Sequence, residues 1–299
     1  MKVFLLDGTY ELFRHYYGVP PHENQAREEV GATRGVVSSV LGMLEEGATH
    51  IGVATDHVIE SFRNALWASY KSSAGAPANL LSQFGLLEEA LEAMGVVVWP
   101  MTDLEADDAL ASAAAVVSED PSVEQVLICT PDKDLGQCVR GDRVVCLDRR
   151  KRLIVDEDAV RARFGVGPGA VPDWLALVGD SSDGFPGLPG WGPKAATTVL
   201  AHYGSIEAVP REPRAKWPVD LPVSRAEALR AVLDEAYEAA MLFKRLATCV
   251  VERGLLPPPE AATGSLEWHG LAPAFGEMCM RLDAPVLLQR AEGLAAKRL

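Results

Sequence analysis

The sequence predicts an α/β fold in which a mainly parallel central sheet is flanked by helices. Short apolar runs alternate in the first half of the chain with longer stretches whose apolar residues recur at helical spacing. Several of these runs end at an aspartate, as Lys2–Leu6 does at Asp7. Parallel strands present their carboxyl ends at one edge of the sheet, where ligand sites form. We therefore expect the aspartates to converge at that edge.

The elements expected in the first half follow in order. Lys2–Leu6 is a buried first strand, and Ala32–Glu45 is a helix with apolar residues on one face. A second strand, His50–Ala54, has Asp56 just past its end. Three further strands are expected at Val96–Trp99, Gln125–Cys129 and Arg143–Leu147. This alternation is typical of α/β proteins.

A long segment, Phe62–Met94, separates the second and third expected strands. Its first part, around Tyr70–Pro77, is too small and polar to pack as core, and its second part, Leu80–Met94, is expected to form an amphipathic helix. A long excursion beside a binding edge more often serves as a lid or arch than as filler. We expect an arch at about residues 63–94 within a core of residues 1–160.

After Arg152 the pattern changes to short helices joined by Gly/Pro turns, which indicates a helical subdomain at residues 161–256. Its last helix is expected to run unbroken over Ser224–Val251, capped by Ser224 with Glu227 at the capping-box position. Earlier helices are expected at Asp156–Phe164, Pro172–Val178 and Lys194–Tyr203, with a Gly/Pro loop at Gly179–Pro193. Residues 257–299 form a tail whose packing the sequence does not predict.

Composition and the lengths of the apolar runs indicate which class of protein this is. The 299-residue chain has 48% hydrophobic residues, enough for a substantial core. No apolar run approaches the about 20 residues of a membrane span, and the amino terminus reaches Asp7 too early for a signal peptide. The five cysteines are odd in number and form no Cys-x-x-Cys pair, which favours buried free thiols over disulfides or zinc. We expect a cytoplasmic protein without a membrane segment.

Carboxylates crowd the run Glu105–Asp108 at the start of an alanine-rich helix. An exposed first turn, favoured by the helix dipole, would explain one acidic side chain but not three in four residues. Such neighbours repel each other unless a cation lies between them. The run therefore indicates a divalent metal site.

Further carboxylates are expected to join this site. Asp132 and Asp134 flank Lys133 after a strand, and Asp180 and Asp183 lie in a Gly-rich loop, so a solvated turn is the alternative for both pairs. Hard cations with oxygen ligands suit such a set, and two Mg²⁺ or Mn²⁺ ions about 4 Å apart would hydrolyse phosphodiesters. The expected metal-binding residues are Asp7, Asp56, Glu105, Asp107, Asp108, Asp132, Asp134, Asp180 and Asp183.

The Gly-rich stretch Gly187–Ala196 leads into an expected helix. Free amides at a helix start and the charge of Lys194 suit a phosphate, so the stretch indicates contact with a DNA backbone, with a structural turn as the alternative. The residues expected to contact DNA there are Gly187, Gly190, Gly192 and Lys194. Arg14, Arg63 and Lys71, each more typical of a surface charge alone, are expected near the carboxylate edge.

The balance of charge argues against nucleic-acid binding. There are 28 basic and 42 acidic side chains, for a formal net charge of −14. Binding of phosphates usually depends on clustered Lys and Arg. DNA affinity is therefore expected to be weak and strongly dependent on salt and Mg²⁺.

Five motifs stand in order along the chain: LLDGTYELFR (Leu5–Arg14), SFRNALWASYK (Ser61–Lys71), EADDALAS (Glu105–Ser112), TPDKDLGQ (Thr130–Gln137) and LVGDSSDGFPGLPGWGPKAA (Leu177–Ala196). Together they resemble the 5′ nuclease family, the flap endonucleases and 5′–3′ exonucleases that include the N-terminal domain of bacterial DNA polymerase I. Five ordered motifs make the resemblance specific. It implies a PIN-like nuclease core with a helical arch and a C-terminal subdomain of the helix-hairpin-helix type.

The resemblance also implies a reaction: cleavage of DNA phosphodiesters, by a two-metal mechanism, where a duplex meets a 5′ single strand. The first, catalytic metal would be bound by Asp7, Asp56, Glu105, Asp107 and Asp132, and the second by Asp108, Asp134, Asp180 and Asp183. Lys71 would steady the scissile phosphate at the base of the arch, and Arg14 would hold a nearby phosphate. Arg63 and Tyr70, which flank the start of the arch, are expected to contact DNA.

The same resemblance implies which further ion and which partners this protein binds. A K⁺ ion is expected at the helix-hairpin-helix element, alongside the two Mg²⁺ or Mn²⁺ ions. The partners are expected to be DNA with a 5′ flap or a 5′ single-strand end, together with replication or repair proteins. We expect a stand-alone, monomeric bacterial protein associated with the nucleoid.

Two departures from the family pattern stand out. Ala74 replaces an arginine that usually follows the Tyr-Lys pair, and Gly184 replaces a common asparagine. All carboxylates of both metal sites are present, so we expect an active enzyme. The alternatives are a PIN-like nuclease acting on RNA, a class that generally lacks the Gly-rich hairpin, and a non-catalytic DNA-structure-binding protein.

Overall fold

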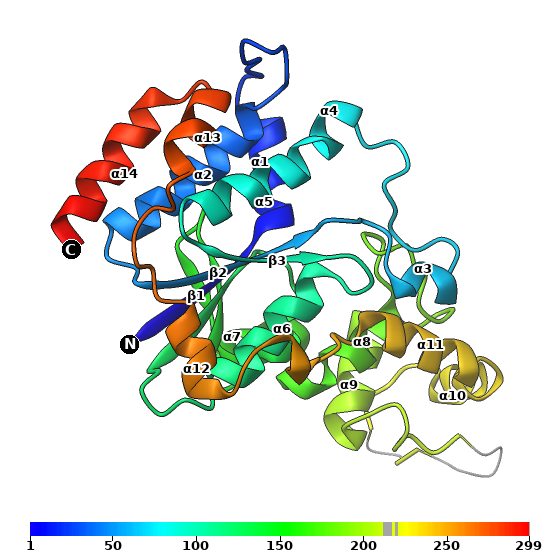
Figure 1. Ribbon diagram of the computed structural model, residues 1–299. Coiled ribbons are helices and arrows are strands. Elements are labelled where there is room, and N and C mark those ends of the chain that lie inside the picture. Colours follow the sequence, from blue (N-terminus) through cyan, green and yellow to red (C-terminus); the bar gives the residue numbers. More distant parts are fainter. Residues whose placement is uncertain (212–216, 219–220, 299) are drawn as a thin grey trace. The chain divides into compact units, whose positions relative to one another are not determined.

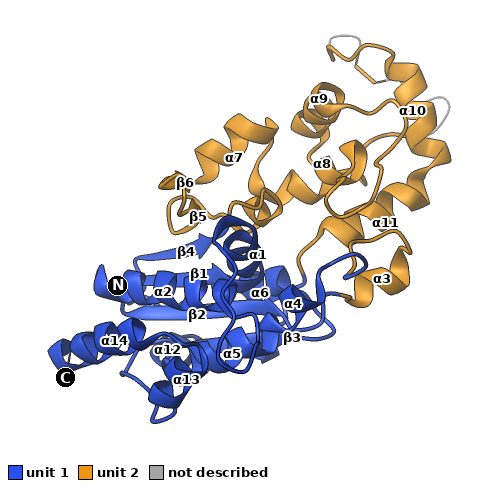
Figure 2. Cartoon of the chain, turned by 90° about the horizontal axis from the view of Figure 1, so that it is seen from above, with its two compact units in different colours: residues 1–59, 73–130, 250–299 blue, residues 60–72, 131–249 orange. Residues whose placement is uncertain are grey.

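The computed structural model describes residues 1–211, 217–218 and 221–298 (Figure 1). The chain divides into two compact units, which Figure 2 shows in different colours. Unit 1 comprises residues 1–59, 73–130 and 250–299, and unit 2 comprises residues 60–72 and 131–249. The units are therefore interleaved along the sequence, because each is assembled from separate stretches of chain.

Unit 1 contains four parallel strands, as the sequence predicted, and the structure places them in the spatial order β3-β2-β1-β4. They are β1 (Lys2–Asp7), β2 (His50–Asp56), β3 (Val97–Met101) and β4 (Gln125–Cys129). Asp7 pairs with Ala54, and Asp56 pairs with Met101. Asp7 and Asp56 are the last residues of their strands, so both carboxylates lie at the same edge of this sheet.

Helices cover both faces of this sheet. On one face lie α2 and α5, and on the other lies α6, which contacts all four strands (Figure 1). Leu41 and Leu44 of α2 and Leu87 and Leu91 of α5 are fully buried. The bounds are α1 (Gly8–Gly18), α2 (Gly31–Glu45), α4 (Ala78–Leu81), α5 (Gln83–Ala93) and α6 (Ala106–Val117). The helix predicted at Leu80–Met94 thus corresponds to the end of α4 and to α5, with Ser82 between them.

The C-terminal tail completes the core of unit 1. Its helices are a short 3₁₀ turn (Arg253–Leu255), α12 (Pro259–Ser265), α13 (Phe275–Arg281) and α14 (Pro285–Arg298). The Trp268 indole N–H donates to the Met94 carbonyl at 2.8 Å, and the Arg290 guanidinium pairs with Glu45 at 2.7 Å. Phe275 and Cys279 are buried. The tail is therefore part of the fold.

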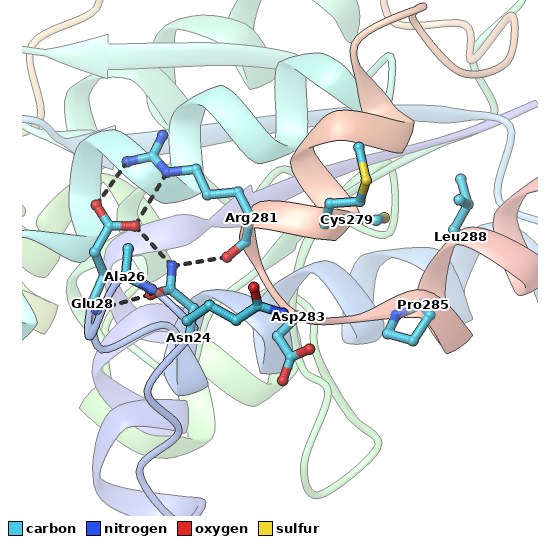
Figure 3. A pocket seen from close by; sticks show the side chains of 10 residues that line it. Asn24, Ala26, Glu28, Cys279, Arg281, Asp283, Pro285 and Leu288 are labelled. Carbon is cyan, nitrogen blue, oxygen red and sulfur yellow. Dashed lines mark hydrogen bonds and ion pairs between the residues drawn. The ribbon is translucent and has the colours of Figure 1, made fainter.

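A cavity of about 450 Å³ lies between the loop near residue 25 and the tail helices (Figure 3). The Asn24 side-chain amide donates to the Arg281 carbonyl at 2.9 Å, and the Arg281 guanidinium contacts Glu28. These bonds fasten the loop to the end of α13.

Unit 2 is mainly helical. Two antiparallel strands, β5 (Val144–Asp148) and β6 (Leu153–Val155), form a hairpin, of which the sequence predicted only the first strand. Helix α11 packs against α8, which also contacts α9, and Phe243 of α11 stacks on Phe185 with ring centroids 5.6 Å apart. The helices are α3 (Phe62–Leu66), α7 (Glu157–Phe164), α8 (Val171–Val178), α9 (Pro193–Tyr203), α10 (Ala226–Glu235) and α11 (Tyr237–Ala247), with 3₁₀ turns at Asp134–Cys138 and Pro168–Ala170.

The prediction of one unbroken helix over Ser224–Val251 was wrong. The chain bends at Ala236, which has φ −105° and ψ 24° and separates α10 from α11. The predicted cap was also wrong, because α10 is preceded by Arg225 in a left-handed conformation with no side-chain cap. With the bend, the Leu229 carbonyl of α10 accepts a hydrogen bond from the Trp191 indole N–H while Phe243 of α11 stacks on Phe185. The two helices thus pack against different partners.

Two further findings concern the chain as a whole. In the described ranges no helix has the length and apolarity needed to cross a membrane. The five cysteines are free thiols, of which Cys129, Cys146 and Cys279 are buried.

Candidate active site

The ends of β1 and β2 hold two of the predicted metal-binding carboxylates in unit 1. Asp7 caps α1 by accepting a hydrogen bond from the Tyr10 backbone N–H at 2.8 Å, and its other oxygen accepts from the Thr130 hydroxyl at 2.9 Å. Asp56 accepts from the Ala106 backbone N–H at 2.8 Å. Both side chains are almost fully buried. Hydrogen bonds thus join the end of β1 to Thr130 and the end of β2 to the first turn of α6.

The run Glu105–Asp108 forms the start of α6. Glu105 is the N-cap, and one Asp108 oxygen accepts from the Glu105 backbone N–H at 3.0 Å. The other Asp108 oxygen accepts from the Val250 backbone N–H at 2.7 Å. Glu105 is 2% and Asp108 0% exposed, whereas Asp107 is half-buried. An exposed, solvated helix turn therefore does not describe Glu105 or Asp108, and Asp108 also has a structural role that the sequence did not predict.

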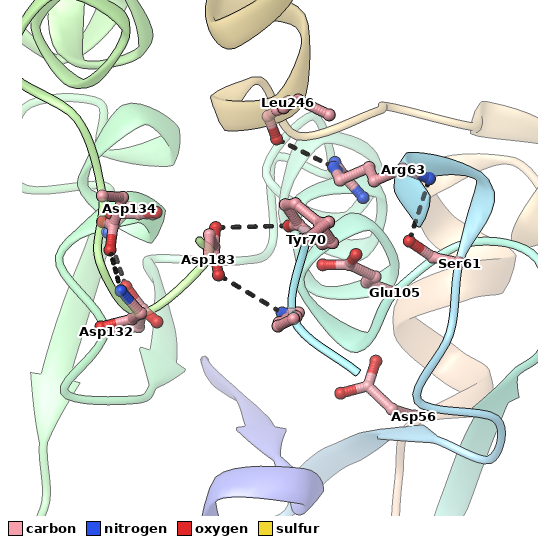
Figure 4. Close-up of polar contacts among 12 residues, drawn as sticks. Asp56, Ser61, Arg63, Tyr70, Glu105, Asp132, Asp134, Asp183 and Leu246 are labelled. Carbon is pink, nitrogen blue, oxygen red and sulfur yellow. Dashed lines mark hydrogen bonds and ion pairs between the residues drawn. The ribbon is translucent and has the colours of Figure 1, made fainter. Parts of the chain in front are cut away.

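The other predicted metal-binding residues lie in unit 2. The Asp134 backbone N–H donates to Asp132 at 2.8 Å (Figure 4), and the Ser182 N–H donates to Asp180 at 2.8 Å. Burial, followed by the charge of Asp132 and more weakly those of Asp183 and Asp180, raises the pKa of Asp134 to about 7, although Lys133 acts in the opposite direction. The negative charges of these carboxylates therefore oppose the ionisation of Asp134.

One cation partly compensates for this crowding. The Lys133 ammonium contacts Asp180 and lies 3.2 Å from Oδ1 of Asp134. Burial alone would lower the pKa of Lys133, but the neighbouring carboxylates outweigh it and raise the pKa. Oδ1 of Asp134 is nevertheless buried and accepts no hydrogen bond. The Lys133 ammonium thus supplies positive charge where a metal cation would, but it leaves one Asp134 oxygen without a hydrogen bond.

The donor set fits a hard divalent cation. The predicted ligands are all carboxylates, the ligand type that Mg²⁺ and Mn²⁺ prefer. Across the described part of the chain, no three His, Cys, Asp or Glu side chains are already grouped to hold a metal ion.

Two predicted phosphate-binding cations are held by carboxylates. The Arg14 guanidinium donates to the buried Glu11 at 2.5 Å, and 30% of the Arg14 side chain is exposed. The Lys71 ammonium lies 3.9 Å from Asp183, with 29% of its side chain exposed. Each is oriented by a carboxylate and still reaches solvent, as a phosphate-binding residue must.

Arg63 and Tyr70, which the sequence predicted to contact DNA, are both buried. Arg63 is 2% exposed, and its guanidinium donates to the Leu246 and Thr248 carbonyls, both at 2.9 Å, at the C-terminal end of α11 (Figure 4). It therefore caps a helix by binding its free carbonyls. Tyr70 is 4% exposed, and its hydroxyl donates to Asp183. The expectation that the part around Tyr70–Pro77 is too small and polar to pack as core therefore does not hold for Tyr70. Neither side chain is available to a DNA backbone.

The Gly-rich stretch divides into a packing part and a surface part. Gly187 is buried with φ +69°, and a Cβ there would lie 2.4 Å from the Gly179 nitrogen, so close packing requires glycine at this position. Gly190 and Lys194 are exposed, and Gly192 is the N-cap of α9. A cavity of about 300 Å³ lies beside this helix start.

Sequence reasoning missed several supporting residues. The Thr9 hydroxyl accepts from the Asp56 backbone N–H at 2.8 Å, and the Thr130 hydroxyl donates to Asp7. Thr130 is the first residue of the motif Thr130–Gln137, and its position two residues before Asp132 is a signal that could have identified it. Buried Glu88 accepts from the Thr55 hydroxyl and from His57, and no sequence signal singled it out.

Comparison with known proteins assigns the family. Residues 2–165 match the family described as "5′-3′ exonuclease, N-terminal resolvase-like domain", and residues 166–260 match "5′-3′ exonuclease, C-terminal SAM fold". The chain is 33% identical over 254 residues to DNA polymerase I of Pseudomonas aeruginosa, covering 82% of this chain but only 26% of that protein. It is 31% identical over 209 residues to the 5′-3′ exonuclease of Aquifex aeolicus, covering 69% of this chain and 71% of that protein.

Two solved structures illustrate the shared fold. A variant of T5 5′-exonuclease gives a TM-score of 0.61 at 16% identity, covering 98% of this chain and 97% of that one. The catalytic core of Rad2 in complex with DNA substrate gives 0.62 at 14% identity, covering 98% and 92%. Because its two family matches together span residues 2–260, this chain belongs to the 5′–3′ exonuclease family.

Proposed function

We propose that this chain is a divalent-metal-dependent, structure-specific 5′ nuclease that hydrolyses DNA phosphodiesters where a duplex meets a 5′ single strand. The observation that carries the proposal is Asp134, whose pKa is raised to about 7 by burial and by three other carboxylates, with a buried oxygen that accepts no hydrogen bond. A site so short of positive charge suits divalent cations. Family membership supports the reaction type, and one solved relative, T5 D15 protein, was co-crystallised with metal ions.

The proposal assigns a role to each predicted metal ligand and to two cations, Lys71 and Arg14. Two Mg²⁺ or Mn²⁺ ions would supply an activated water and stabilise the leaving oxygen. The first ion is assigned to Asp7, Asp56, Glu105, Asp107 and Asp132, and the second to Asp108, Asp134, Asp180 and Asp183. Lys71 supplies positive charge to the scissile phosphate, and Arg14 holds a neighbouring phosphate.

Binding of duplex DNA is assigned to the start of α9. Exposed Gly190 and Lys194 and half-buried Gly192 present backbone amides and one ammonium group to a phosphate, and K⁺ would bind at the same element. In this proposal residues 1–160 carry the nuclease core, residues 63–94 feed the 5′ strand, residues 161–256 grip the duplex, and the protein acts as a monomer in the bacterial cytoplasm. The net charge of −14 makes binding depend on the metals and on low salt.

The test is cleavage of a labelled 5′-flap duplex in Mg²⁺, in Mn²⁺ or with EDTA. The wild type is expected to cut in either metal and not with EDTA, and Asp107→Ala and Lys71→Ala are expected to lose at least about 100-fold in rate. Asp158→Ala, an exposed carboxylate on α7, is the matched control and should cut normally. Full activity in Asp107→Ala would refute the metal assignment. Cleavage of RNA but not of DNA would favour an RNA nuclease. DNA binding without cleavage would favour a non-catalytic DNA-binding protein.

A further inference from the structure

The segment Trp67–Lys71 packs against the turn at Asp183–Gly184 within unit 2. The Trp67 indole N–H donates to the Gly184 carbonyl at 2.9 Å, and the Lys71 backbone N–H donates to the Asp183 carbonyl at 3.2 Å. Trp67 also packs edge-on against Phe243, with ring centroids 5.3 Å apart. Two stretches more than 100 residues apart in sequence are therefore joined by backbone and side-chain contacts.

Side chains reinforce the same junction. The Tyr70 hydroxyl donates to Oδ2 of Asp183 at 3.3 Å, as Figure 4 shows, and the Lys71 ammonium lies 3.9 Å from Oδ1. Because Tyr70 is 4% exposed, its hydroxyl is held in place by packing. The Asp183 carboxylate is thus gripped on one oxygen by Tyr70 and faced on the other by Lys71.

Gly184 makes this close approach possible. It has φ +81°, and a Cβ built on it would lie 2.1 Å from the carbonyl oxygen of Ser69. The obstacle is backbone, which cannot swing aside as a flexible side chain can. Any other residue at 184 must therefore push the segment that carries Tyr70 and Lys71 away from the turn that carries Asp183.

We propose that Gly184 and Tyr70 are positioning residues that hold the metal ligand Asp183 and the phosphate-binding Lys71 as one rigid element. The inference rests on the proposed nuclease function, because it assigns Asp183 and Lys71 the roles given there. Since the Lys71 amide is bonded to the Asp183 carbonyl, a shift of either residue moves the other. Correct placement of the ammonium group on the scissile phosphate thus depends on the turn that bears the metal ligand.

The first test uses Gly184→Ala, with Gly204→Ala as the matched control. Gly204 has φ +86°, but no atom lies within 4 Å of the place a Cβ would take, so it carries the same conformational cost without the clash. Gly184→Ala is expected to raise the hydrogen-exchange rate of the Lys71 amide about tenfold, to weaken Mn²⁺ binding by calorimetry three- to tenfold, and to lower kcat about tenfold with little change in KM. Gly204→Ala should leave all three near wild type. Equal effects of the two substitutions would overturn the proposal.

A double-mutant cycle separates positioning from general destabilisation. If Gly184 acts on kcat through Lys71, then at saturating Mn²⁺ Gly184→Ala in a Lys71→Ala background should cost little further activity, because the group to be placed is already missing. Additive losses would show that the two residues act independently and would refute the proposal. Tyr70→Phe keeps the ring and removes only the hydroxyl, so it should weaken Mn²⁺ binding about threefold, whereas Tyr203→Phe should not.

The outcomes for the inference and for the proposed function are distinguishable. If the wild type binds Mn²⁺ but cuts no flap substrate, the proposed function fails while the exchange and binding comparisons still decide the inference. If the wild type cuts and Gly184→Ala leaves the Lys71 amide, Mn²⁺ affinity and kcat unchanged, the inference fails alone. A wild type that neither binds Mn²⁺ nor cuts would overturn both.

Discussion

The backbone N–H of Ala106 donates a 2.8 Å hydrogen bond to the carboxylate of Asp56, which joins the end of β2 to the first turn of α6. The positive end of a helix stabilises an anion placed there. This contact therefore fixes the Asp56 carboxylate at the sheet edge before any metal is bound.

Asp56 variants should separate this structural bond from the chemistry. Asp56→Ala is expected to lose activity and about 1–2 kcal/mol of unfolding free energy, because a buried N–H is left unpaired. Asp56→Asn keeps an acceptor for the Ala106 N–H and should lose less stability, yet it should lose metal-dependent cleavage as fully. Urea unfolding and flap cleavage measure the two effects. Normal cleavage by Asp56→Asn would contradict the assignment of Asp56 to the metal site.

Lys133 offers a test of the second metal site. Its ammonium contacts Asp134 and Asp180, so it competes for the carboxylates that a divalent ion would use. Lys133→Met should bind Mn²⁺ severalfold more tightly by calorimetry, and its metal-free form should melt lower at pH 8 because carboxylate repulsion is no longer balanced. The control is Lys151→Met, an exposed lysine paired with Asp148. Weaker Mn²⁺ binding by Lys133→Met would count against this role.

Docking of the tail helix α14 should weaken in acid. A hydrogen bond from Arg290 lowers the pKa of Glu45 below its ordinary value of 4.5. A lowered carboxyl pKa contributes stability that is present above the unfolded pKa and is lost as the pH falls through the folded one. Because both side chains are partly exposed to solvent, the Glu45–Arg290 pair contributes only about 0.5 kcal/mol to the stability of the docked helix.

Hydrogen exchange of α14 amides, converted to opening free energies, measures this effect between pH 6 and pH 3.5. The wild type should lose protection below about pH 4.5, the range in which Glu45 titrates. Arg290→Gln should start with less protection and change less over the same range. A steeper loss in Arg290→Gln than in the wild type would exclude the Glu45–Arg290 pair as the cause.

Lys194 tests the proposed grip on duplex DNA. Its exposed ammonium at the start of α9 is assigned to a phosphate, so Lys194→Ala should weaken binding of different duplex sequences to a similar degree. The slope of log affinity against log salt should fall by about 1. Fluorescence anisotropy at several salt concentrations measures both, with Lys151→Ala as the control. An unchanged salt slope would place the duplex elsewhere on the protein.

Most of the parallel sheet and the carboxylate positions followed from the order of residues. Buried strands are short apolar runs, and the residue at the end of each run must lie at the carboxyl edge, so Asp7 and Asp56 could be placed without coordinates. The run Glu105–Asp108 was recognisable because like charges at that density need a counter-charge. These features depend on local composition and on the geometry common to all parallel sheets.

The burial of Arg63 and Tyr70 and the bend at Ala236 could be seen only in the tertiary structure. Arg63 and Tyr70 lie in a polar stretch, and only the packing of α11 and of the Asp183 turn shows that both are buried. The bend at Ala236 has no Gly or Pro to signal it, because it arises from two separate packing partners for α10 and α11. The tail gave no periodic signal strong enough to place it, since its Trp268 and Arg290 bind groups contributed by distant parts of the chain. Contacts of this kind depend on which surfaces meet, and a local sequence pattern does not carry that information.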